Sequence, residues 1–102
     1  MNTACLEVKN WAEFQHYGKR NPPWIKLHRA ILDDYNFCAL SDASKGHLLL
    51  IWLLASQNNG KVPHDVEFLE RKLSVSSLKL EPLIECGFLI SLSGASKTLA
   101  EG

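Results

Sequence analysis

The sequence has no excess of charge of either sign. Its 102 residues include 11 Lys plus Arg and 11 Asp plus Glu, so the formal net charge at pH 7 is zero. This balance excludes a strongly basic chain that phosphates hold along its whole length. It leaves room for a local basic face, because the two signs of charge can be concentrated in different regions.

Long apolar runs are also missing. The longest, Leu48 to Ala55, is far shorter than the roughly 20 residues that a membrane-spanning helix needs. The chain does not open with a basic region followed by an apolar stretch, so we expect no signal peptide. These features and the chain length predict one soluble cytoplasmic domain.

Cysteine is scarce and its spacing is irregular. Cys5, Cys38 and Cys86 are the only three cysteines and form no C-x-x-C pair. The spacing excludes a disulfide framework and a zinc knuckle. Because Cys38 and Cys86 lie among apolar residues, we predict that both side chains are in the core.

The sequence contains none of the common catalytic motifs. It has no G-x-S-x-G, no Walker loop and no H-E-x-x-H, and its four histidines are scattered. No histidine pair has the helical i, i+4 spacing with a carboxylate companion that favours metal binding. We therefore predict no enzymatic activity, no metal and no cofactor.

The N-terminal third predicts a strand, a connector and a short helix. Alternating apolar and polar residues over 6–11 predict a half-buried strand whose partner lies near the other end of the chain. One glycine and two prolines in 18–23 predict an exposed connector. Apolar residues at three- and four-residue spacing over 24–32 predict a helix, which the polar run 33–36 ends.

The middle of the chain predicts two capped helices. Ser41 is a good N-cap for a helix that continues to Ala55, and the unbroken apolar run predicts that this helix is buried on every side. After the stop at 57–60, with Asn59 or Gly60 as left-handed cap, residues 61–63 predict a short extended piece. Asp65 caps the next helix, whose inner stripe is formed by Val66, Leu69 and Leu73.

The C-terminal part predicts a turn, a short helix and a hairpin. Residues 74–77 form a polar turn. Pro82 is tolerated only in a first turn, so the final helix begins no earlier than about Leu78, and Gly87 closes it. Residues 88–92 predict a strand, 93–96 a turn and 97–99 a return strand.

This order of elements predicts a mainly α protein with a small β-sheet (α+β). From Ser41 onward it describes a winged helix-turn-helix, with an N-terminal strand and helical extension before it. We divide the chain into an N-terminal strand with a basic, proline-containing connector (1–23), a winged-helix domain (24–99) and a tail (100–102).

The local sequence resembles a known family. The motifs are L-S-x-x-x-K-G-x-L-L-L-x-x-L-L-A-S, N-G-K-V-P and L-I-E-x-G-F-L-I, with W-x-x-F-Q-H-Y and R-N-P-P-W-I-K-L-H-R-x-I-L-D-D upstream. Over roughly 11–90 they resemble the N-terminal domains of phage and prophage replication or replisome-organiser proteins. The resemblance implies a DNA-binding domain in a bacterial host cell, with other replication proteins as partners.

The candidate DNA-binding residues fall in three places. The stretch 14–29 contains four Lys or Arg residues and no acid, and can serve either as an arm on the DNA backbone or as a solvated connector. The final helix is short, carries Glu81 and Glu85, and lacks Arg, Asn or Gln for reading bases. We therefore predict weak contacts to duplex DNA, mainly through phosphates, made by Lys19, Arg20, Arg71, Lys72, Ser76, Ser77, Lys79 and Lys97.

The alternative is a winged-helix module for protein interaction or homodimerisation, without DNA contact. The balanced charge and the short final helix favour it, and pairing through the edge of the N-terminal strand or of the wing is one form. Among the aromatic residues, we predict core positions for Trp52 and Phe88, and a packing role for Trp24. Trp11, Phe14 and Tyr17 are predicted to share one helical face that packs on the domain, the alternative being a platform on which bases stack.

Overall fold

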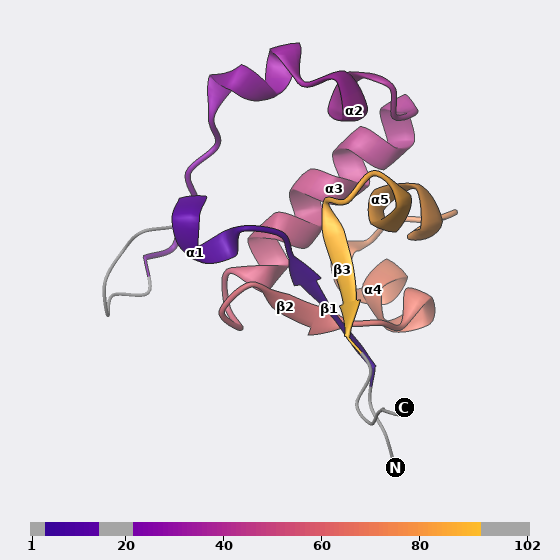
Figure 1. The fold of residues 1–102 in the computed structure, drawn as a ribbon. Coiled ribbons are helices and arrows are strands. Elements are labelled where there is room, and N and C mark those ends of the chain that lie inside the picture. Colours follow the sequence, from indigo (N-terminus) through magenta and orange to yellow (C-terminus); the bar gives the residue numbers. More distant parts are fainter. Residues whose placement is uncertain (1–3, 15–21, 93–102) are drawn as a thin grey trace, which may run out of the picture.

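A small sheet organises the fold, and its central strand comes from the N-terminus. The computed structural model describes residues 4–14 and 22–92. In it β1 (Cys5–Val8) lies between β2 (Lys61–Pro63) and β3 (Leu89–Leu92) and runs antiparallel to both (Figure 1). Pairing of the N-terminal strand with a strand near the other end of the chain is thereby confirmed.

The central place of β1 also corrects one prediction. Both edges of β1 are paired, so this strand cannot form a dimer through a free edge. The strand is shorter than predicted because Asn10 adopts a left-handed backbone with φ of 58°, and the chain then enters α1 (Trp11–Phe14). Asn tolerates this conformation better than most residues.

After α1 the described part of the chain forms one 3-10 helix, η1 (Arg29–Asp33), and four α-helices: α2 (Tyr35–Cys38), α3 (Asp42–Ala55), α4 (Val66–Leu73) and α5 (Glu81–Glu85). The protein is therefore an α+β domain with a small antiparallel sheet. Its core lies where α3, α4 and α5 meet the sheet, and its largest fully buried side chains are Leu6, Leu48, Ile51, Leu69, Leu80, Leu83 and Leu89.

The predicted caps of α3 and α4 are present. The Ser41 hydroxyl accepts a hydrogen bond from the backbone N–H of Ser44 at 3.1 Å, and the Asp65 carboxylate accepts one from that of Phe68 at 3.1 Å. The prediction that α3 is buried on every side is wrong, however. Leu53 is 46% exposed, because the sheet and α5 cover only part of the helix.

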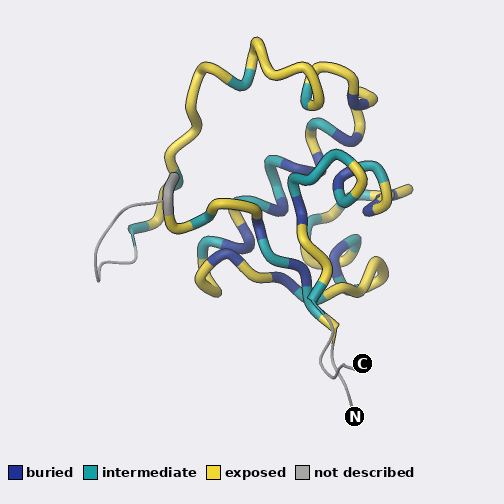
Figure 2. Tube along the Cα trace, viewed as in Figure 1, coloured by how far each residue is buried: buried dark blue, intermediate teal, exposed yellow. Residues whose placement is uncertain are grey.

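The segment before α3 differs most from the prediction. Residues 24–28 are not helical, and only a 3-10 turn follows them. That turn ends at Asp33 with Asp34 as its C-cap, within the polar run predicted to end the helix. Asp34 also begins a further helix, α2, since its side chain accepts from the backbone N–H of Phe37 at 2.9 Å. We call residues 22–38 the arch. It stands away from the sheet in Figure 1 and is exposed over most of its length in Figure 2.

The arch also explains the outcome for the cysteines. Cys38 is exposed and its thiol donates to the carbonyl of Leu32 at 3.1 Å, so the predicted core position is wrong. Cys86 is half-buried against the core, and all three cysteines are free. Trp52 and Phe88 also pack on the core while remaining partly exposed.

The turn between α4 and α5 and the short final helix are confirmed. Ser74 and Ser77 both have left-handed backbones, at φ of 58° and 56°. Pro82 lies in the first turn of α5, and Gly87 follows its end with φ of 85°. The predicted turn 93–96, the return strand 97–99 and Tyr17 lie outside the described residues. In the part of the chain that is described, no helix is both long and apolar enough to cross a membrane.

Two glycines provide a matched test of this fold. Gly46 lies within α3 with no atom within 4 Å of an added Cβ, so Gly46→Ala is expected to stabilise the protein by about 1 kcal/mol. At Gly60, φ is 85° and an added Cβ would lie 2.5 Å from Cγ of Trp11. Gly60→Ala is expected to destabilise by at least ~1–2 kcal/mol.

Urea unfolding followed by circular dichroism measures both changes. Equal and small effects of the two substitutions would contradict the packing of Trp11 on the turn after α3.

Candidate nucleic-acid interface

The predicted interface residues within the described chain lie on the connection between α4 and α5. Arg71 and Lys72 are in the last turn of α4, Ser76 and Ser77 are in the turn, and Lys79 precedes α5. All five side chains are exposed. The last turn of α4 also suits cations, because the helix dipole is negative at that end.

A hydrogen bond from the backbone N–H of Leu78 to Glu70 holds this connection together. The Glu70 carboxylate accepts it at 3.0 Å, and the side chain of Leu78 is buried. Because the Glu70 carboxylate accepts this hydrogen bond, its negative charge is less available to neutralise the neighbouring cations. The bond also brings Lys79, the neighbour of Leu78, close to the end of α4.

No ion pair neutralises the cations of the connection in the part of the chain that the structure describes. Among residues 4–14 and 22–92, neither Arg71, Lys72 nor Lys79 forms an ion pair, and the ion pair between Lys45 and Asp42 lies on α3. Glu67, Glu81 and Glu85 are exposed on the same two helices and limit the local positive charge. The surface is therefore only moderately basic.

The turn adds uncharged donors. Both hydroxyls, of Ser76 and Ser77, are exposed, and neither makes a hydrogen bond to another described residue. The backbone N–H groups of Ser76, Ser77 and Lys79 are likewise unpaired within the described chain. Ser and Lys side chains and backbone N–H groups are the groups that contact phosphate oxygens in protein–DNA complexes.

The other predicted contacts are not brought into this interface. Lys19, Arg20 and Lys97 lie outside the described residues. From the basic stretch 14–29, Lys26 and Arg29 are described, and both are exposed on the arch. Of the predicted contact residues, the structure therefore describes those of the α4–α5 connection, and the arm residues Lys19 and Arg20 and the wing residue Lys97 stay predictions.

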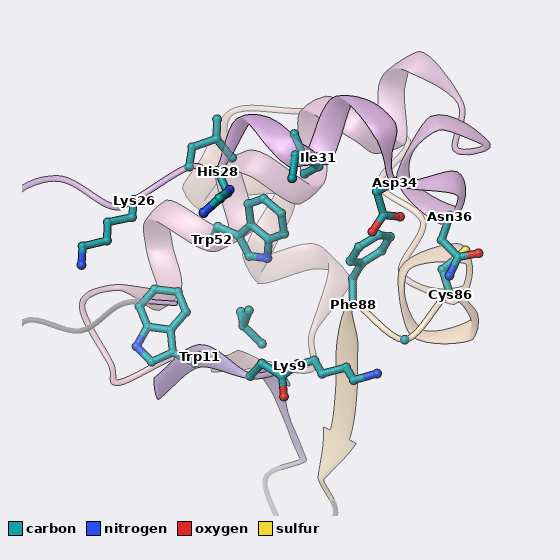
Figure 3. Close-up of a pocket in the computed structure, with 15 residues that line it drawn as sticks. Lys9, Trp11, Lys26, His28, Ile31, Asp34, Asn36, Trp52, Cys86 and Phe88 are labelled. Atoms are coloured by element: carbon teal, nitrogen blue, oxygen red, sulfur yellow. The ribbon is translucent and has the colours of Figure 1, made fainter. Parts of the chain in front are cut away.

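Sequence reasoning missed a second feature, a cavity of about 500 Å³ between the arch and the body. Figure 3 shows Lys9 and Trp11 on one side of it and Trp52 on the other, toward His28 and Ile31 of the arch. These aromatic residues were assigned to packing, because apolar periodicity does not distinguish a core side chain from one that lines a cavity. The arch forms the rest of the lining, and the sequence pattern does not predict its conformation.

Neither a metal site nor a catalytic triad is formed by the described residues. Within the described residues, no group of three or more His, Cys, Asp or Glu side chains is placed to hold a metal ion. Ser91 Oγ lies 3.4 Å from His64 Nδ1 at the end of the sheet, but both residues are exposed. No acid contacts this histidine among the described hydrogen bonds and ion pairs, so the pair lacks the third group of a catalytic triad.

Comparisons of this chain with protein-family models, with curated proteins and with solved structures give no match.

The role of Glu70 can be tested by removing its acceptor oxygens. Glu70→Ala leaves the N–H of Leu78 partly buried without a partner, which is expected to cost about 1–3 kcal/mol. Glu70→Gln keeps a side-chain oxygen at the same position and is expected to lose less than half as much. The measurement is the free energy of unfolding in urea. Equal losses for the two variants would contradict the hydrogen bond as the stabilising contact.

Proposed function

We propose that the chain is a winged-helix DNA-binding domain of a phage or prophage replication-type protein, which contacts duplex DNA mainly through phosphates. The observation that carries the proposal is the α4–α5 connection. There Arg71, Lys72 and Lys79 are exposed without an ion pair in the described chain, while Glu70 is directed to the backbone of Leu78.

The order of elements supports the winged-helix part of this proposal. From Ser41 onward the chain forms α3, β2, α4, a turn, α5 and β3, and β2 and β3 flank β1 in one antiparallel sheet. In a helix-turn-helix the second helix approaches the major groove. Here that helix is α5, with only five residues, which favours backbone contacts over base reading.

The chemistry of the connection supports phosphate contact rather than sequence recognition. Its donors are cations, hydroxyls and backbone N–H groups, and bidentate base contacts need Arg, Asn or Gln on the second helix. Glu81 and Glu85 on α5 oppose a close approach of this helix to the DNA backbone. Binding by this domain alone is therefore expected to be weak and to gain from a second domain or subunit.

Salt dependence tests the proposal. If Arg71, Lys72 and Lys79 each neutralise one phosphate, log K should fall with log salt concentration with a slope of about −2.7. Lys79→Gln should weaken binding to all duplex sequences alike and reduce the slope by about 1. The measurement is fluorescence anisotropy of a labelled, blunt-ended duplex at several salt concentrations.

Lys61→Gln is the matched control, since it removes the same charge from an exposed position on β2. It should leave the slope unchanged. No binding at ~100 μM protein in low salt would refute the proposal, because non-specific binders usually reach that range. An equal effect of the two variants would refute the assignment to the α4–α5 connection.

A specific observation favours the alternative, a protein-interaction domain on the same scaffold. The arch exposes several large apolar side chains, among them Leu27 at 53%, Leu32 at 74% and Tyr35 at 85%. Exposed apolar residues that lie close together are typical of protein contact sites. The salt titration separates the two functions, because a protein-interaction domain without DNA contact would show no measurable affinity for duplex DNA.

A further inference from the structure

The cavity between the arch and the body has the size and lining of a small-molecule site. Its volume of about 500 Å³ falls within the range of roughly 300–1,000 Å³ that is typical of ligand pockets. Its lining comes from parts of the chain that are distant in sequence: the end of β1, the arch, α3 and the turn after α5. The cavity is therefore a product of the tertiary fold and not of one loop.

Aromatic rings form much of its wall, and packing holds them in place. The ring of Phe88 lies edge-on to those of Trp52 and Phe37, with centroids 6.5 and 6.4 Å away. Trp11 packs against Gly60, where even an added Cβ would collide with it. Since Trp11, Trp52 and Phe88 remain partly exposed, their rings can contact a flat ligand without a rearrangement of the core.

The charge of the cavity favours an anion. Lys9 and Lys26 line it together with His28, and Asp34 is the one acid among the described lining residues. The Asp34 carboxylate already accepts the N–H of Phe37 at the start of α2. The amine of Lys9 lies over Gly87, 3.9 Å from the position that a Cβ would take there, which is an ordinary contact distance.

Trp52 contributes the face of its ring and not its indole nitrogen. Trp52 Nε1 is buried and makes no hydrogen bond within the described chain. Because this atom has almost no exposed surface, a ligand in the cavity does not reach it, and the contact with Trp52 is one of stacking.

We propose that this cavity binds one nucleotide, with its base against Trp11 and Trp52 and its phosphate at Lys9. A flat ring and a negative charge are the two properties that the lining selects. A free mononucleotide and an unpaired base of a single strand share this chemistry. The site is separate from the α4–α5 connection and does not depend on duplex binding.

The test uses tryptophan emission of the whole chain, excited beyond the adenine absorption band. Adenosine 5′-monophosphate and a single-stranded DNA hexamer are the probes, and ribose 5-phosphate is the probe without a base. Saturable quenching is expected with the first two and none with the third. Quenching by the hexamer alone identifies a strand as the source of the base, and quenching by both shows that a free nucleotide suffices.

Substitutions localise the binding. Trp11→Leu should raise the dissociation constant about tenfold, in the range that one stacked base contributes. Trp11→Phe keeps a ring and should recover most of that loss. Lys9→Gln should raise the dissociation constant for both base-containing probes. Trp24→Phe is the control: it changes a tryptophan outside the cavity lining and should leave the dissociation constant unchanged.

Three results would overturn the proposal. One is the absence of saturable quenching by either base-containing probe. Another is equal affinity for ribose 5-phosphate and adenosine 5′-monophosphate, which would show a site for anions only. The third is an unchanged dissociation constant in Trp11→Leu and Lys9→Gln, both confirmed to be folded by circular dichroism.

Discussion

The insertion of β1 between β2 and β3 is the constraint on which the rest of the structure depends. Without β1 the two outer strands have no common partner, because neither pairs with the other. Three backbone hydrogen bonds extend the pairing beyond the strands, from Val8 to Gly60 at 2.8 Å, from Lys9 to Phe88 at 3.1 Å and from His64 to Ala4 at 3.1 Å. Leu6, at the centre of β1, has no exposed surface.

This insertion also positions both proposed sites. β2 leads into α4 and β3 follows α5, so the α4–α5 segment is held at both ends by strands that pair with β1. Directly after β1, the chain places Lys9 and Trp11 at the cavity, opposite the arch. The short strand β1 thereby helps to position both the α4–α5 connection and the aromatic residues that line the cavity.

Local signals predicted the parts of the fold that local chemistry determines. The caps at Ser41 and Asp65, the position of Pro82 in the first turn of α5 and the left-handed Gly87 all follow from the conformational preferences of single residues. The arch was not predicted, since the spacing of apolar residues over 24–32 resembles a helix while residues 24–28 have no regular secondary structure. Only the tertiary fold decides between the two.

The candidate site was predictable to a similar degree. The cations of the α4–α5 connection can be chosen from the sequence, because a polar turn between two helices is exposed in almost any arrangement. Their availability was not predictable, as it depends on Glu70 being directed to Leu78, eight residues further along the chain. The cavity was missed for the related reason that Trp11, Trp52 and Phe88 lie far apart in sequence and meet only in the folded chain.

A zero net charge is compatible with the proposed DNA contact because the charges are distributed unevenly. Exposed cations without an ion pair are found on the α4–α5 connection, while the carboxylates of Asp34, Glu70 and Asp65 are engaged in hydrogen bonds to backbone N–H groups. The number of available cations is small, so the balance limits the affinity of the domain without preventing contact.

The most direct test of the central claim is a titration of ¹⁵N-labelled protein with a short blunt-ended DNA duplex at low salt, followed by amide chemical shifts. We predict that the largest shifts fall on residues 71–81 and that they disappear as salt is raised. Shifts confined to the arch and the end of β1, or no shifts at all, would contradict the assignment of DNA contact to the α4–α5 connection.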